Sequence, residues 1–215
     1  MSVSAAPAFD QQFRDSLLEL LRWRRDVRHF RTDPIPREIL AELVEGASLA
    51  PSVGYSQPWR FVSVEDPARR AEIAANFERC NAAALATYTA ERRESYARLK
   101  LAGLREAPAH VAVFADRAGE AGARLGRSTM PQTLEYSVVG AISMLWLLAR
   151  ARGIGVGWVS ILEAHEVAKT LDVPLAWTLV AYLCIGYPND EDDTPELARV
   201  KWQAPLEAAR ILHVR

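Results

Sequence analysis

The segment from Pro131 to Arg152 carries the longest apolar run of the sequence, and this run constrains the fold more than any other feature. Within it, Val138–Ala149 contains a single serine and is shorter than the ~20 apolar residues that a membrane span needs. Proline at the start, basic residues at the end and Gly153 beyond them predict one helix. Because this helix is apolar on nearly every side, we expect it to be buried, with a subunit interface as one place for it.

Other segments alternate between strand and helix patterns. The predicted strands are Trp59–Val64, His110–Ala115, Ile154–Ile161 and Thr178–Tyr187. Predicted helices begin after Asp10, near Pro36 and after Asp66, and one extends over Glu163–Leu171; residues 68–105 are expected to form two polar helices that break near 87–90. An irregular tail is expected beyond the last strand. This mixture predicts a layered α/β or α+β fold, and since no linker is visible we expect a single domain over 1–215.

Composition excludes several classes of function. The 215 residues include 26 Lys and Arg against 27 Asp and Glu, and the resulting net charge of −1 does not indicate a nucleic-acid-binding surface. Cys80 and Cys184 lie far apart, and neither they nor the four histidines have the spacing of metal ligands, so we expect no metal site. The first residues lack a secretory pattern, and the sequence predicts a reducing, cytoplasmic location with neither nucleic acid nor membrane as partner.

The sequence RRDVRHFR is densely basic. On a helix, Arg24, Arg28 and Arg31 would share one face at positions i, i+4 and i+7. Guanidinium groups pair with phosphate oxygens, so one interpretation is a pocket for a phosphate monoester. The other is a solvated helix end paired with carboxylates, which is the more frequent role of basic runs. Asp26 lies among these arginines and is expected to stay ionised, either orienting an arginine or facing a ligand as base or hydrogen-bond acceptor.

Two further segments have the residue types of a ligand site. The loop APSVGYSQPW holds Ser52, Ser56 and Gln57 between two prolines, and it fits either a planar, hydrogen-bonding heterocycle or a simple polar turn. The segment GIGVGWVSI lacks the GxGxxG of dinucleotide folds, but its glycines would let backbone N–H groups approach a ring. Ser160 within it lacks the GxSxG context of serine hydrolases, and its alternative role is that of an ordinary strand serine.

Six segments occur in an order that resembles the flavin-binding nitroreductase family. They are RRDVRHF, LAPSVGYSQPWRFV, LKLAGLREAP, GRSTMPQTLEYSVV, GVGWVSIL and VAYLCIGYP, and together with a basic residue near the C-terminus they extend over roughly residues 22–205. The resemblance implies a three-layer fold with a central, mostly antiparallel sheet. It also implies an intertwined homodimer with FMN at the subunit interface.

More narrowly, the six segments resemble a branch of that family in which reduced FMN is itself the substrate. The implied reaction is fragmentation of reduced FMN by dioxygen to 5,6-dimethylbenzimidazole, the lower ligand of cobalamin, and erythrose 4-phosphate. A separate NAD(P)H-dependent flavin reductase is then the implied source of reduced FMN. Tyr55 and Asp26 depart from the Asn and the small residue of many ordinary nitroreductases. Two alternatives stay open, an NAD(P)H-dependent nitroreductase or flavin reductase and a non-enzymatic FMN-binding protein.

The resemblance also assigns roles to individual residues. Arg24, Arg25 and Arg28 match the phosphate-binding arginines, and Asp26 and Ser160 match the two polar residues associated with activity. The remaining implied flavin contacts are Ser52, Ser56, Gln57, Leu101, Gly157, Trp158, Val159 and, near the C-terminus, Lys201 or less closely Arg199. Residues 68–105, with Leu101 and Leu104 near their end, are implied to form a helical lid that covers the flavin and excludes water.

Overall fold

The computed structural model describes residues 6–99, 102–206, 211 and 213. Four strands form one antiparallel sheet in the order β1-β2-β4-β3, with bounds Trp59–Ser63 (β1), Ala109–Asp116 (β2), Gly155–Val159 (β3) and Trp177–Gly186 (β4). The helices are α1 (Gln11–Trp23), α2 (Arg37–Ala47), α3 (Pro67–Thr87), α4 (Ala90–Ala97), α5 (Thr133–Arg150), α6 (Ala164–Thr170) and α7 (Glu196–Arg199), with short 3-10 turns η1 (Val53–Tyr55) and η2 (Ala121–Arg124).

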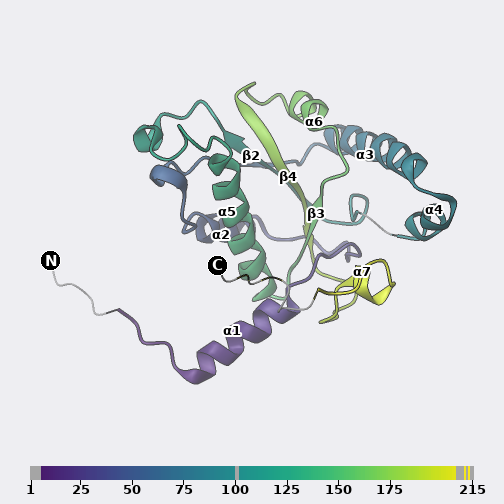
Figure 1. Ribbon diagram of the computed structural model, residues 1–215, viewed down its shortest axis with the longest axis horizontal. Helices are drawn as coiled ribbons and strands as arrows, with labels where there is room; N and C mark the ends of the chain where they lie inside the picture. Colours follow the sequence, from purple (N-terminus) through teal and green to yellow (C-terminus); the bar gives the residue numbers. More distant parts are fainter. Residues whose placement is uncertain (1–5, 100–101, 207–210, 212, 214–215) are drawn as a thin grey trace.

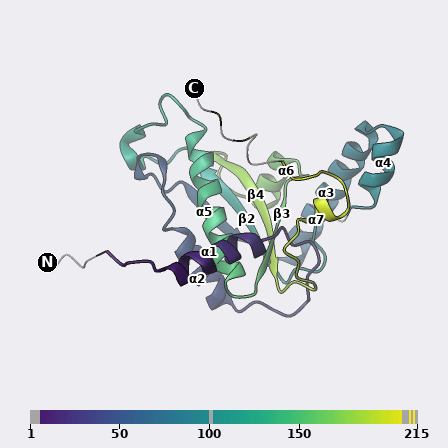
Figure 2. The ribbon, with the colours of Figure 1, turned by 60° about the horizontal axis from the view of Figure 1, so that its bottom comes forward.

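Helices cover both faces of the sheet, which gives three layers (Figure 1 and Figure 2). The helices α2 and α5 pack on one face, and α3 and α6 lie on the other. Successive residues of a strand point to opposite faces, so Val111 and Val113 of β2 join the core under α5 while Ala112 and Phe114 join the core under α6. The predicted α+β fold with a central antiparallel sheet is confirmed.

The helix α5 lies against the sheet, as its apolar sequence predicts. Its sheet-facing side is buried and consists of Leu134, Val138, Ala141, Ile142, Leu145 and Ala149. Its other side is not covered, because Tyr136 is 59% exposed and Val139 is 38% exposed. The helix therefore presents a second apolar strip to the outside of this subunit.

The helix α1 projects from the body of the molecule and meets α5 near its own C-terminal end (Figure 1). The Asp10 side chain accepts a hydrogen bond from the backbone N–H of Phe13 at 2.8 Å, which confirms the predicted cap. Apolar residues of α1 remain exposed, with Phe13 at 46%, Leu17 at 40% and Leu21 at 46%. An apolar helix face that the described residues leave this exposed is typical of an interaction surface.

The arginine motif is not helical, so the prediction that Arg24, Arg28 and Arg31 share a helix face is wrong. The helix α1 ends at Trp23, and the chain continues as an extended segment. The backbone of this segment forms hydrogen bonds with distant parts of the chain. The Val27 N–H donates to the Val156 carbonyl of β3 at 3.0 Å, and the Arg31 N–H donates to the Tyr187 carbonyl at 2.8 Å. These distant hydrogen bonds outweigh a helix that would crowd like charges on one face.

The C-terminal tail also differs from its prediction. A short helix, α7, interrupts the segment that the sequence predicts to be irregular. Four residues make barely one helical turn, too short for a periodic pattern to be visible. Among the described residues, none of the helices combines the length and apolar character needed to span a bilayer.

Candidate functional site

The carboxylate of Asp26 joins the arginine motif to β3. Its Oδ1 accepts the backbone N–H of Trp158 at 2.9 Å, and its Oδ2 accepts Nε of Arg28 at 2.8 Å. The backbone at Asp26 also forms a parallel bridge to Val156. A carboxylate has about four lone-pair positions, so these two bonds leave acceptor capacity on both oxygens. The Asp26 side chain is 32% exposed and thus still reaches solvent or a ligand.

The glycines of β3 make this junction possible. A Cβ on Gly157 would lie 2.1 Å from the Val27 carbonyl oxygen, and one on Gly155 would lie 2.7 Å from a Val27 methyl carbon. The close backbone approach predicted from these glycines is therefore made, within this subunit, to the arginine motif itself. A contact between Gly157 and flavin stays a prediction.

Three guanidinium groups, those of Arg24, Arg25 and Arg28, are called the arginine cluster below. Arg24 lies over the Trp146 ring at 4.9 Å from its centroid. Arg25 donates through Nε to the Asp193 carbonyl at 2.8 Å, and burial, followed by repulsion from Arg24, lowers its pKa below the ordinary value. The Arg28 side chain is only 12% exposed and also lies 3.9 Å from the Glu196 carboxylate. Arg24 is thus close enough to repel Arg25, and Arg25 and Arg28 line one small pocket, although each arginine is held by a different partner.

The residues after β4 bring acidic groups near this cluster, because the charges of Asp193 and Asp192 act on Arg25. Glu191 pairs with Arg150 at 2.6 Å, and Asp192 pairs with Arg199 at 3.1 Å. Lys201, which the resemblance favours over Arg199 as the C-terminal phosphate contact, is exposed, and in the part of the chain that the structure describes it forms no ion pair. Of the two, Lys201 is the one that is not already neutralised by a carboxylate.

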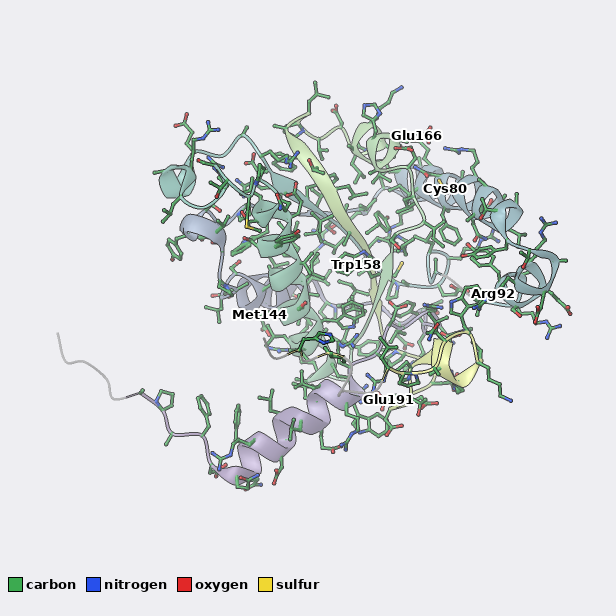
Figure 3. All side chains as sticks on the ribbon, viewed as in Figure 1. Cys80, Arg92, Met144, Trp158, Glu166 and Glu191 are labelled. Atoms are coloured by element: carbon green, nitrogen blue, oxygen red, sulfur yellow. The ribbon has the colours of Figure 1, made fainter. Side chains whose placement is uncertain are left out.

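Trp158 contacts Asp26 directly, and Ser160 lies two residues further along the chain. Ser160 directly follows β3 and is exposed, and it stands two residues beyond Trp158, about 7 Å along an extended chain. Trp158 is half-buried, its ring centroid lies 6.5 Å from that of Trp146, and Figure 3 shows it at the centre of the molecule. Of the two residues predicted as catalytic, Asp26 thus lies alongside β3 and Ser160 directly follows its last residue.

The predicted heterocycle loop has its own internal order. The Ser52 hydroxyl accepts the backbone N–H of Gln57 at 3.0 Å, and the Val53 N–H donates to the Ser137 hydroxyl at 3.0 Å. Tyr55 and Gln57 have positive φ angles of 56° and 45°. The buried Ser56 Oγ has no hydrogen-bond partner among the described residues. An unsatisfied buried hydroxyl beside strained backbone is typical of a loop that contacts a ligand or partner.

Within one subunit this loop and the arginine cluster do not meet. The loop is bound to Ser137 near the start of α5, whereas Arg24 and Arg25 are held by Trp146 near its end. These two α5 residues are nine positions apart, which is about 14 Å along a helix. The structure therefore brings Asp26 and Arg28 together, with Ser160 two residues along the chain from the Trp158 contact, but not with Ser52, Ser56 and Gln57.

The predicted lid corresponds to α3, α4 and the chain that returns to β2. The break between α3 and α4 falls at 88–89, as predicted. Leu101 lies outside the described residues, and Leu104 is half-buried in the core under α6. A Cβ on Gly103 would lie 2.4 Å from the ring of Phe30, so the returning chain packs directly on the arginine motif.

Sequence reasoning missed three residues that shape this site. The Trp146 side chain donates through Nε1 to the Arg25 carbonyl at 3.1 Å, but in the sequence it is hidden within the apolar run. Glu196 and Trp202 lie in the tail, where the density of acidic residues was the one visible signal. No group of three His, Cys, Asp or Glu among the described residues is arranged to hold a metal ion.

Comparisons with known proteins agree with this geometry. The chain is 60% identical over 198 residues to a protein from Rhodospirillum rubrum named 5,6-dimethylbenzimidazole synthase, with 92% of this chain and 94% of the relative covered. A relative of the same name from Rhodobacter capsulatus is 50% identical, again over 92% of this chain and 96% of its own length.

Solved structures show the same fold. An iodotyrosine deiodinase bound to FMN and 3-iodo-L-tyrosine aligns with a TM-score of 0.70 at 28% identity, covering 82% of this chain and 91% of that one. A nitroreductase family protein from Streptococcus pneumoniae aligns with a TM-score of 0.68 at 20% identity, covering 93% and 100%. The family model described as "Nitroreductase family" matches residues 21–187, from the end of α1 to the residue after β4. With this match and relatives so similar over nearly the whole chain, the protein belongs to the nitroreductase family.

Proposed function

We propose that this protein is a 5,6-dimethylbenzimidazole synthase, which fragments reduced FMN with dioxygen to 5,6-dimethylbenzimidazole and erythrose 4-phosphate. The observation that carries the proposal is the 60% identity, over 92% of the chain, to a relative of that name. The product is the lower ligand of cobalamin. The position of Asp26, between Arg28 and the backbone of β3, supports the proposal from the side of geometry.

The residues present fit FMN. A phosphate monoester carries up to two negative charges, and the guanidinium groups of Arg24, Arg25 and Arg28 are suited to its oxygens. The unpartnered, buried Ser56 Oγ fits a polar ring edge, with Ser52 and Gln57 beside it. Gly157, Trp158, Val159, Leu101 and Lys201 complete the proposed contacts.

Bound reduced FMN supplies the electron-rich ring with which dioxygen reacts and the carbon atoms of the product. The chain's own contribution is to position groups and move protons. Asp26, fixed by Arg28 and the Trp158 N–H, accepts a proton from the ribityl side, and the Ser160 hydroxyl orients oxygen. Each well-placed acid–base contact contributes about 10²–10⁴ in rate. The α3–α4 excursion excludes water from the ring.

The active form is proposed to be a homodimer. The loop with Ser52 and Ser56 lies about 14 Å along α5 from the groups that hold the arginine cluster, so one subunit alone does not assemble the whole site. The exposed apolar residues of α1 and α5, Phe13, Leu17, Leu21, Tyr136 and Val139, supply a surface that a second copy would bury. A sedimentation experiment tests this, and a monomer at micromolar concentration contradicts it.

The test of the reaction is aerobic incubation of the purified protein with FMN and a separate NAD(P)H-dependent flavin reductase, followed by mass analysis. The proposal expects 5,6-dimethylbenzimidazole and loss of FMN. Rapid oxidation of NAD(P)H by this protein alone, with FMN intact, would instead assign a nitroreductase or flavin reductase. Reoxidation to intact FMN with hydrogen peroxide, and no benzimidazole, would assign a flavin-binding protein without this activity.

A further inference from the structure

The residues from Glu196 to Trp202, called the C-terminal unit below, form one hydrogen-bonded turn. The helix α7 ends where Lys201 takes a left-handed conformation with φ of 59°. The Lys201 N–H donates to the Ala198 carbonyl at 3.0 Å, and the Trp202 N–H folds back to the Leu197 carbonyl at 2.8 Å. Such a closure satisfies the last carbonyls of a helix. Glu196 and Trp202 are therefore parts of one short, internally bonded body.

One end of the C-terminal unit faces the arginine cluster. The Glu196 carboxylate lies 3.9 Å from Nε of Arg28 and is 20% exposed. The residues just before it bind Arg25, because both Nε and Nη2 of Arg25 donate to the Asp193 carbonyl. A phosphate bound by Arg28 must therefore share that guanidinium with Glu196 and lie beside it.

The other end of the C-terminal unit holds α4. The guanidinium of Arg92 lies 4.6 Å from the centre of the Trp202 ring, and its Nη1 donates to the Trp202 carbonyl at 3.2 Å. Tyr88 meets the same indole edge-on at 5.8 Å, and Tyr96, which is buried, lies at 6.2 Å. In Figure 3, Arg92 lies on the side of α4 near α7, while Glu191 lies beyond α7 near the end of α1.

We propose that Trp202 is a positioning residue that ties α4 to the phosphate-binding end of the site, so that a phosphate monoester on the arginine cluster orders α4. The inference rests on the proposed binding of FMN by that cluster. A phosphate draws Arg25, Arg28 and Lys201 toward one anion, and this restricts the C-terminal unit that carries Trp202. The aromatic contacts then pass the restriction to α4, the outer helix of the excursion that shields the flavin.

The experiment is hydrogen exchange of the α4 peptide in the whole protein, with saturating FMN or saturating riboflavin, which lacks the phosphate. The wild type is expected to exchange at least about threefold more slowly with FMN than with riboflavin. Trp202→Ala is expected to lose this difference while FMN binding changes less than about threefold, and Trp202→Phe, which keeps an aromatic ring, is expected to retain most of the difference.

Trp177→Ala is the matched control. Trp177 lies on β4, and its ring centroid is 5.9 Å from the guanidinium of Arg60, so this variant removes another tryptophan that packs under an arginine. It should leave the difference between the two ligands unchanged. Should Trp202→Ala not fold, Arg92→Met removes the guanidinium from the indole and must reduce the difference. Equal exchange of α4 with both ligands in a wild type that binds FMN overturns the coupling alone, as does an undiminished difference in Trp202→Ala. A wild type that binds no FMN overturns the proposed function together with the coupling.

Discussion

The backbone N–H of Trp158 donates to the carboxylate of Asp26 at 2.9 Å, across 132 positions of sequence. The same carboxylate accepts Nε of Arg28 at 2.8 Å. One side chain thus fixes both the strand that leads into Ser160 and an arginine of the proposed phosphate site.

Asp26→Asn is expected to lower the rate of product formation by at least about 10², while FMN still binds. The amide keeps the size of the side chain, but its nitrogen cannot accept a hydrogen bond. One of the two hydrogen bonds, from Arg28 or from the Trp158 N–H, is therefore lost. We expect a loss of about 1–3 kcal/mol in the free energy of unfolding. Product yield, flavin titration and urea unfolding measure the three effects.

The control is Asp33→Asn. Asp33 also accepts Nε of an arginine two residues away, Arg31, at 2.8 Å, but it is half exposed and, among the described residues, forms no hydrogen bond with a strand. That variant should keep its turnover. If Asp26→Asn forms product at the wild-type rate, Asp26 has no part in the chemistry.

Glu196→Gln is expected to tighten FMN binding by about two- to fivefold, because Glu196 competes for the Arg28 guanidinium with the phosphate. Riboflavin binding should not change, since riboflavin brings no phosphate. Fluorescence titration of both flavins at low salt measures the two affinities, and the gain for FMN should shrink as salt rises. Weaker FMN binding in this variant would mean that Glu196 supports the phosphate site and does not compete with it.

Gly157→Ala is expected to destabilise the protein by more than about 2 kcal/mol and to weaken FMN binding. The new Cβ would lie 2.1 Å from the Val27 carbonyl oxygen, so the backbone of the arginine motif must leave β3. Gly119→Ala is the control, because its Cβ meets no atom closer than 3.5 Å. Unfolding in urea compares the two variants, and equal midpoints would refute the close packing of Val27 on β3.

The buried His110 side chain is expected to lower the stability of the protein in mild acid. Its ring shares a hydrogen bond of 2.9 Å with the Tyr182 hydroxyl inside the core under α6, and burial, followed by the charge of Arg70, lowers its pKa to about 4. The unfolded chain takes up this proton more readily, near pH 6.5. The neutral His110 side chain therefore makes its full contribution to the free energy of unfolding above pH 6.5. About 3 kcal/mol of this free energy is lost as the pH falls to 4.

The measurement is the free energy of unfolding at pH 7, 5.5 and 4.5 for wild type and His110→Gln. The variant has no imidazole to protonate, so its stability should fall less steeply between these values. His165→Gln, which removes an exposed imidazole, should follow the wild type. Parallel curves for all three proteins would show that His110 is not the group that titrates.

Elements with clear terminal signals were predictable from sequence. Asp10 and Asp66 cap α1 and α3 with their side chains, and Gly153, with φ of 69°, follows α5 as expected. These signals are local, so they do not depend on the rest of the fold. Together with the four strand patterns they predicted a layered α/β or α+β fold, whereas the three-layer arrangement was implied by the resemblance to the nitroreductase family.

The site was less predictable because its contacts are distant in sequence. The spacing of Arg24, Arg28 and Arg31 suggested a helix, but hydrogen bonds to Val156 and Tyr187 decide the backbone there. Nothing in the pattern of the tail indicates that Glu196 and Trp202 lie near Arg28 and Arg92. Residue types were informative about chemistry, whereas tertiary packing determines which of them meet.

The arginine motif has one further effect, on solubility. β3 is an edge strand of the sheet, and an uncovered edge strand is a template for pairing with other chains. Here the outward carbonyl of Val156 is bound by Val27, and the outward N–H of Trp158 is bound by Asp26. Substitutions that detach this segment would therefore uncover a strand edge, and inactive variants of this kind should also aggregate.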